Sequence, residues 1–112
     1  MPSPSPSPKP CVAFSTCANA DDARKIARAL VGEGLAACVN QVPGATSTYR
    51  WQGKVVEEGE VLLVIKTRMD LVQAIAARFA KLHPYDTPEL VTLPIEAGSE
   101  KYLGWLLANT EE

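Results

Sequence analysis

The sequence predicts an α+β fold, because short strand-like runs alternate with two helical patterns in the order strand, helix, strand, strand, helix, strand, and a third helix follows. Two segments carry apolar residues at helical spacing, around residues 23–30 and 71–82. The two middle strands meet at Gln52-Gly53, a two-residue turn typical of hairpins. This order is the ferredoxin-like plan, with sheet order 4-1-3-2 and the two main helices on one face.

The central hairpin spans residues 35–67 and is unusually long. Counting outward from its turn pairs residues whose numbers sum to about 105, so Gly44 lies near Val61 and Thr46 near Gly59. Pro43-Gly44 and Gly59 therefore weaken the ladder at one height and predict a bulge or bend there. Each arm of about 15 residues extends roughly 50 Å at ~3.3 Å per residue. We therefore expect the tip, residues 49–54, to project from the domain.

The other elements have clear boundaries. Residues 11–17 form the first strand, and Asn19 can cap the helix that ends near Gly32 and Gly34. A second helix is expected over residues 69–82, where Pro84 stops it. The last strand spans residues 89–95, its Pro94 indicates a sheet edge, and Ser99 can cap the final helix.

The first ten residues, MPSPSPSPKP, alternate serine and proline. Proline lacks a backbone donor, so this stretch is expected to be an extended tail that joins neither a helix nor a strand ladder. Residues 11–112 then form a single domain.

Composition and charge argue against several kinds of partner and several cellular settings. A net charge of −2 and a pI near 5.4, with scattered basic residues, disfavour nucleic acid and anionic membrane as partners. Three cysteines argue against a disulfide framework. No apolar run is long enough to span a membrane, and the N-terminus lacks the apolar core of a signal peptide, so a cytoplasmic setting is expected.

The run VLLVI at residues 61–65 is apolar at both strand parities, which predicts that both sides of this strand are buried. Two helices can cover only one face of the sheet, and monomers rarely leave a large apolar patch exposed. A second subunit, or at least the last helix, must cover the other face. We expect a homo-oligomer held by the 35–67 hairpin and the sheet face.

Several functions of this fold require residues that the chain lacks. Its three cysteines are too far apart for a cluster ferredoxin, no Cys-x-x-Cys is present, and EVLLVIKT lacks the aromatics of an RNA-recognition domain. No Ser-His-Asp, phosphate-loop or His-Glu-x-x-His pattern appears. An enzyme is not expected.

Five segments together resemble the CutA family, named for divalent cation tolerance: LAACVN, PGATSTYRWQGK, EVLLVIKT, HPYDTPEL and GSEKYLGWL. The likeness runs from Val12 to Leu107. It implies a homotrimer similar in architecture to the PII signalling proteins, in which long hairpins embrace neighbouring subunits. The resemblance leaves two further functions open, a PII-like sensor whose ligand sits between subunits and a structural scaffold without a ligand.

The topology places Cys17, His83, Tyr85 and Glu89 at one end of the sheet, because the first strand ends where its antiparallel neighbour begins. Thiolate, imidazole and carboxylate suit Cu(II) or Zn(II). The resemblance implies copper binding by the cysteine and the histidine at the positions of Cys17 and His83. Some relatives carry two adjacent histidines, where this chain has Leu82-His83.

Each of these residues also has a structural interpretation. His83 could bind the last carbonyls of its helix, Cys17 could be a small packing residue, and Glu89 could be a solvated acid. The aromatic residues are expected in the interface or the core; they are Tyr49, Trp51, Tyr102 and Trp105.

Overall fold

The computed structural model describes residues 8–111 and contains one four-stranded sheet and three α-helices in these residues. The elements follow in the order β1 (Pro10–Cys17), α1 (Ala20–Gly32), β2 (Cys38–Trp51), β3 (Lys54–Arg68), α2 (Val72–Leu82), β4 (Val91–Pro94) and α3 (Glu100–Ala108). A single 3-10 turn, Met69–Leu71, precedes α2, so the second helix begins as a tighter turn where a continuous α-helix was expected. No helix of these residues is long and apolar enough to cross a membrane.

The sheet order is β2-β3-β1-β4, which is 4-1-3-2 counted from the other edge, and every neighbouring pair is antiparallel. The four-residue strand β4 lies at one edge of the sheet. No further strand lies beyond it to need the backbone N–H that Pro94 lacks. Both helix caps that the sequence suggested are present. Asn19 accepts a hydrogen bond from the backbone N–H of Asp22, and Ser99 accepts one from that of Tyr102.

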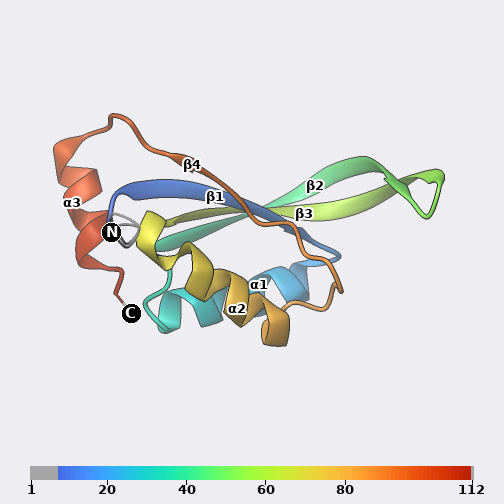
Figure 1. Ribbon diagram of the computed structural model, residues 1–112, viewed down its shortest axis with the longest axis horizontal. Coiled ribbons are helices and arrows are strands. Elements are labelled where there is room, and N and C mark those ends of the chain that lie inside the picture. The colour runs from blue at the N-terminus through green and yellow to red at the C-terminus, as the bar shows by residue number, and fades with distance from the viewer. Residues whose placement is uncertain (1–7, 112) are drawn as a thin grey trace, which may run out of the picture.

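The hairpin of β2 and β3 extends well beyond the rest of the sheet (Figure 1). β1 pairs with β3 only between Val61 and Arg68, so the outer part of β3 pairs with β2 alone. At the tip, Gln52 and Gly53 both have positive φ, 50° and 80°, as a type I′ turn requires. The register shifts between Val42 and Ala45, around Gly44 at φ 84°, so the predicted bulge is confirmed.

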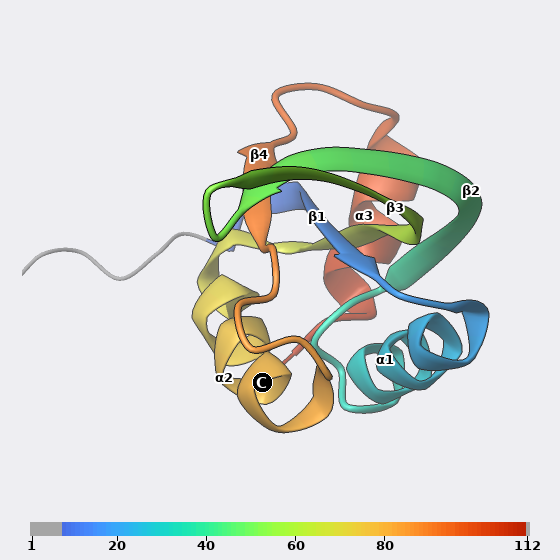
Figure 2. The ribbon, with the colours of Figure 1, turned by 90° about the vertical axis from the view of Figure 1, so that its right-hand side faces the viewer.

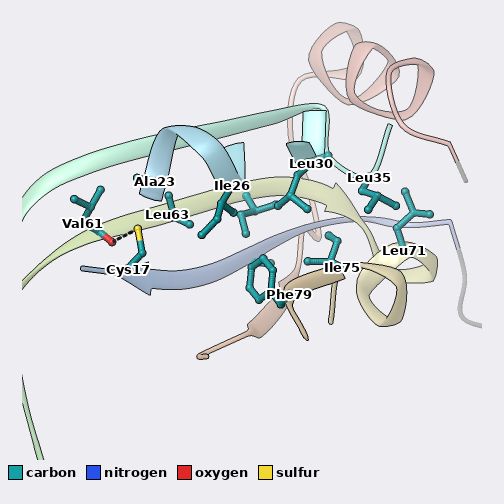
Figure 3. Packing of buried hydrophobic residues seen from close by; sticks show 13 residues of the cluster. Cys17, Ala23, Ile26, Leu30, Leu35, Val61, Leu63, Leu71, Ile75 and Phe79 are labelled. Carbon is teal, nitrogen blue, oxygen red and sulfur yellow. Dashed lines mark hydrogen bonds between the residues drawn. The ribbon is translucent and has the colours of Figure 1, made fainter. Parts of the chain in front are cut away.

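The two faces of the sheet differ. Helices α1 and α2 lie side by side on one face (Figures 1 and 2), and the buried core between helices and sheet includes Ile26, Leu63 and Phe79 (Figure 3). Helix α3 lies at the end of the sheet away from the hairpin tip (Figure 1), and no helix lies over the rest of the opposite face. The middle of that face is therefore uncovered in the single chain.

The uncovered face is apolar. Strand register brings together the half-buried Val12, Phe14, Leu62 and Val64 with the exposed edge residues Val42, Val91 and Leu93. Leu93 leaves 61% of its surface exposed and Val91 56%. On α3, Tyr102 and Trp105 are also exposed, so these two aromatics do not belong to the core of the single chain.

The N-terminal boundary of the domain lies earlier than predicted. The tail was expected to end at residue 10, but Pro10 begins β1, opposite Arg68. The carbonyls of Lys9 and Pro10 accept hydrogen bonds from the N–H groups of Met69 and Ile95. Proline lacks a donor but keeps its acceptor, and these bonds need only the acceptor. The prediction for residues 1–7 concerns residues outside the described part of the chain.

Candidate functional site at the hairpin end of the sheet

The end of β1 and the loop after α2 come together as the topology predicted. His83 directly follows α2, and its imidazole lies buried against Phe79 and Tyr85, with ring centroids 5.2 and 4.9 Å away. Its Nε2 lies 2.9 Å from the carbonyl oxygen of Thr16, and its Nδ1 accepts from the backbone N–H of Tyr85 at 3.1 Å.

These two contacts fix the state of the ring. Because Nδ1 accepts a hydrogen bond, Nε2 carries the proton and donates it to Thr16, so both nitrogens of a neutral imidazole are engaged. The ring of His83 therefore ties the loop after α2 to the end of β1. This differs from the expected cap, since the ring bonds none of the last carbonyls of its own helix.

Cys17 is the last residue of β1, next to Thr16. Its side chain is fully buried in the core cluster, with Sγ 3.7 Å from the carbonyl oxygen of Asn19 and 4.0 Å from that of Val61 (Figure 3). Burial, and secondarily the charge of Asp22, raises the pKa of the Cys17 thiol. The side chain is a protonated thiol packed in the core, whereas metal ligation requires the thiolate.

Next to His83, Tyr85 reaches across to β3. Its phenol donates to Oε2 of Glu60 at 2.7 Å, and Glu60 is 8% exposed. Burial, together with the bond to Glu60 and the charge of that carboxylate, raises the pKa of Tyr85. Burial also acts to raise the pKa of Glu60, but hydrogen bonding with Ser47, Tyr85 and Thr16 leaves this pKa below its ordinary value. Glu60 is thus a nearly buried carboxylate held in its charged form.

A cavity of about 640 Å³ opens beside this pair, between the outer part of the hairpin and the loop that leads to β4. Its carboxylates are Glu58, Glu60, Asp86 and Glu89, and its aromatic residues are Tyr49, Trp51 and Tyr85. The remaining lining residues are the hydroxyl residues Thr16, Ser47, Thr48 and Thr87. Among residues 8–111, no lysine, arginine or histidine lines it. The cavity is therefore an anionic and aromatic environment.

The predicted metal ligands do not form a site together. Among residues 8–111, no group of three or more His, Cys, Asp or Glu side chains is placed to hold a metal ion. Cys17 faces the core, His83 has no free lone pair, and Glu89 is exposed on the cavity wall. As they lie, these three residues do not fit Cu(II) or Zn(II), which need free donor atoms around one point.

The sequence reading missed Glu58 and Glu60 as site residues. They have the same strand parity, so both project from one side of β3, and Ser47 of β2 lies opposite Glu58. The spacing of two residues between Glu58 and Glu60 could therefore have indicated, from the sequence, that the two carboxylates lie on one side of the strand. Their meeting with Tyr85 depends on how the loop after α2 folds back, which the chain order alone does not specify.

Fold and site together define a small α+β protein with an overlong hairpin, one uncovered apolar sheet face and an acidic, aromatic cavity beside the outer part of the hairpin. A model of the family described as CutA1 divalent ion tolerance protein matches residues 11–109, and the chain belongs to that family.

Similar proteins support the assignment. The "Divalent-cation tolerance protein CutA" of Thermus thermophilus is 52% identical over 99 residues, covering 88% of this chain and 96% of that protein. "Protein CutA" of Mus musculus is 48% identical, but the match spans only 56% of its length. The solved CutA1 structure from Oryza sativa has a TM-score of 0.90 at 43% identity, covering 93% of this chain and 95% of that one.

Proposed function

We propose that the protein acts as a homotrimer in tolerance of divalent cations. Family membership supports the cellular role, because the Thermus relative carries divalent-cation tolerance in its name. The observation that carries the assembly is the uncovered sheet face, where exposed Val91 and Leu93 continue a surface of half-buried Phe14 and Val64. A contiguous apolar surface of this kind marks a protein interface.

The hairpin provides the second element of this assembly. Its outer part pairs with no other strand of its own chain and carries exposed Tyr49, Trp51 and Val55. Aromatic residues on a projecting ribbon are suited to contact a neighbouring subunit. In the proposed trimer each hairpin embraces the next subunit, as in PII-like architectures, while the sheet faces meet in the middle.

Binding of Cu(II) or a similar ion through Cys17, His83 and Glu89 stays a prediction. In this structure, binding would require an unfavourable change at two of these residues. His83 must give up one of its two ring hydrogen bonds, and Cys17 must lose a proton that burial favours. Each change opposes binding, so we expect a weak interaction. Calorimetric titration with Cu(II) and Zn(II) tests it; binding that Cys17→Ala and His83→Ala leave unchanged would remove this site.

The cellular role is tested by tolerance. In a bacterial host whose own relative has been deleted, expression of this chain is expected to restore growth at raised Cu(II), and empty vector is not. A variant that folds but no longer assembles, Leu93→Asp, separates the role of the trimer from that of the single chain. Full rescue by that variant would contradict a trimeric mode of action.

The proposal also covers the cellular location of the protein and whether it catalyses a reaction. We propose a cytoplasmic location and no catalytic activity, and cell fractionation tests the first. The relative in Arabidopsis thaliana is named chloroplastic, so the location can differ between members. A PII-like sensor is the alternative, and the cavity beside the outer part of the hairpin is the observation that favours it.

A further inference from the structure

We propose that in the trimer Glu58, on the hairpin of one subunit, forms an ion pair with Lys66 on the sheet face of the next subunit. This pair rests on the proposed trimer and adds one specific contact to it. The contact fixes which part of the neighbouring sheet face the hairpin covers.

One side of the outer hairpin is both aromatic and acidic. Alternate residues of β3 share one side of the strand, so Glu58 lies on the same side as Leu62 of the uncovered face. The register with β2 places Tyr49 and Trp51 on this side as well, with 38% and 53% of their surfaces exposed. Because this side continues the uncovered sheet face, it is the side that lies against the next subunit in the proposed trimer.

Covering that side brings a carboxylate into the interface. Glu58 is exposed in the single chain. The ion pairs found in residues 8–111 join Arg68 to Asp70 and Arg78 to Glu33, so neither of them includes Glu58. A carboxylate that loses water without gaining a countercharge opposes association. The next subunit must therefore present a positive charge at this point.

The uncovered sheet face carries such a charge. Lys66 lies opposite Val12 of β1 and is half-buried among the residues of this face. Its Nζ donates to the uncharged amide of Asn40, which leaves two of the three ammonium donors for a carboxylate. Arg68, on the same side of β3, already forms an ion pair with Asp70. Lys66 is therefore the base on this face that can receive an acid from another subunit.

Glu58 and Lys66 pair between subunits and not within one. They are eight residues apart in the continuous strand β3, which separates them by roughly 26 Å at ~3.3 Å per residue. A ring of three copies is head-to-tail, so each subunit joins one surface to a different surface of its neighbour. A hairpin that projects past its own sheet (Figure 1) is suited to reach the face of the next copy, where Lys66 lies.

Charge reversal tests the pair. Glu58→Lys and Lys66→Glu each bring like charges together at all three interfaces of a trimer. We expect each variant to lower the urea concentration at which half of the trimer has dissociated, measured by light scattering, by about 1 M or more. The double variant Glu58→Lys/Lys66→Glu restores opposite charges and should recover most of this loss. Losses that add in the double variant would overturn the pair.

Two matched controls separate this contact from net charge and from another base. Glu57→Lys reverses an exposed acid on the other side of the same strand and should leave the urea midpoint near that of the parent. Lys54→Glu reverses a base on the same side of the hairpin, at its tip, and should not rescue Glu58→Lys. An equal loss in Glu57→Lys, or rescue by Lys54→Glu, would contradict the assignment to Lys66.

Carbodiimide coupling of the parent protein is a second measurement that needs no variant to fold. In trimers of isotope-labelled and unlabelled chains, unfolded and refolded together, we expect a peptide that joins Glu58 of one chain to Lys66 of a differently labelled chain. A parent mass of 12.0 kDa would refute the trimer itself. A trimer that forms without this cross-link, and whose midpoint the single reversals leave unchanged, would refute the pair alone.

Discussion

The hydrogen bond from Tyr85 to Glu60 gives a quantitative prediction about stability. Tyr85→Phe removes only the phenol oxygen, which lies 2.7 Å from a carboxylate that is 8% exposed. Hydrogen bonds to charged groups contribute about 1.5–3 kcal/mol. Because Tyr85 is only one of the groups that lower the pKa of Glu60, we expect a loss near the lower end, about 1.5 kcal/mol at neutral pH.

The loss must depend on pH with a definite sign. The pKa of Glu60 is lowered in the folded protein, so its ionised form contributes stability above the unfolded value of about 4.3, and this contribution disappears as the pH falls through the folded value. Tyr85→Phe removes one of the bonds that lower this pKa. The difference in unfolding free energy between parent and variant should therefore be largest near neutral pH and shrink in acid.

Urea unfolding of both proteins, at one protein concentration and at a series of pH values, measures this difference. The matched control is Tyr49→Phe, which removes a phenol whose pKa is raised by its interaction with Glu58, but at an exposed site where such interactions contribute little. A loss that is independent of pH, or as small as that of Tyr49→Phe, would refute the reasoning about Glu60.

Two further substitutions probe the sheet face and the chain end. Leu93→Asp places a charge on the uncovered face and should dissociate the oligomer, since burying a leucine contributes roughly 1.5–3 kcal/mol per subunit and a buried unpaired charge costs more. The control Val31→Asp changes an exposed apolar residue on α1 and should leave the oligomer intact. Light scattering measures the mass of both variants. Gly34→Ala should lower the melting temperature, because Gly34 has φ 76° and an added Cβ would lie 2.8 Å from the carbonyl oxygen of Glu111. Gly59→Ala, with open space and no positive φ, is its control, and an equal loss in both would contradict this explanation.

The hairpin was predictable in detail because local signals specify it. Gln52-Gly53 favours the turn, the turn sets the register, and the register places Pro43-Gly44 at the bulge. The uncovered sheet face followed from the two apolar parities of residues 61–65. These features depend on period and turn chemistry, which a sequence shows directly.

The sequence predicted where the site lies in the fold, but not which side chains form it. The strand order brought His83 and Tyr85 to the end of β1, as expected. Which way each side chain points depends on the loop after α2, where the ring of His83 is held by Thr16 and Tyr85 rather than left free. Cys17 faces the core because burial alternates along β1 and Cys17 shares the side of buried Ala13. The other side of the strand carries Val12 and Phe14 and is at least as apolar, so the sequence did not show which side faces the helices.

The central claim is that the uncovered sheet face and the projecting hairpin assemble three copies of this chain. Light scattering coupled to size exclusion measures this most directly, over a dilution series of the parent protein. The prediction is a mass of about 36 kDa, three times the 12.0 kDa of one chain, that persists on dilution. A single species at 12 kDa would contradict it.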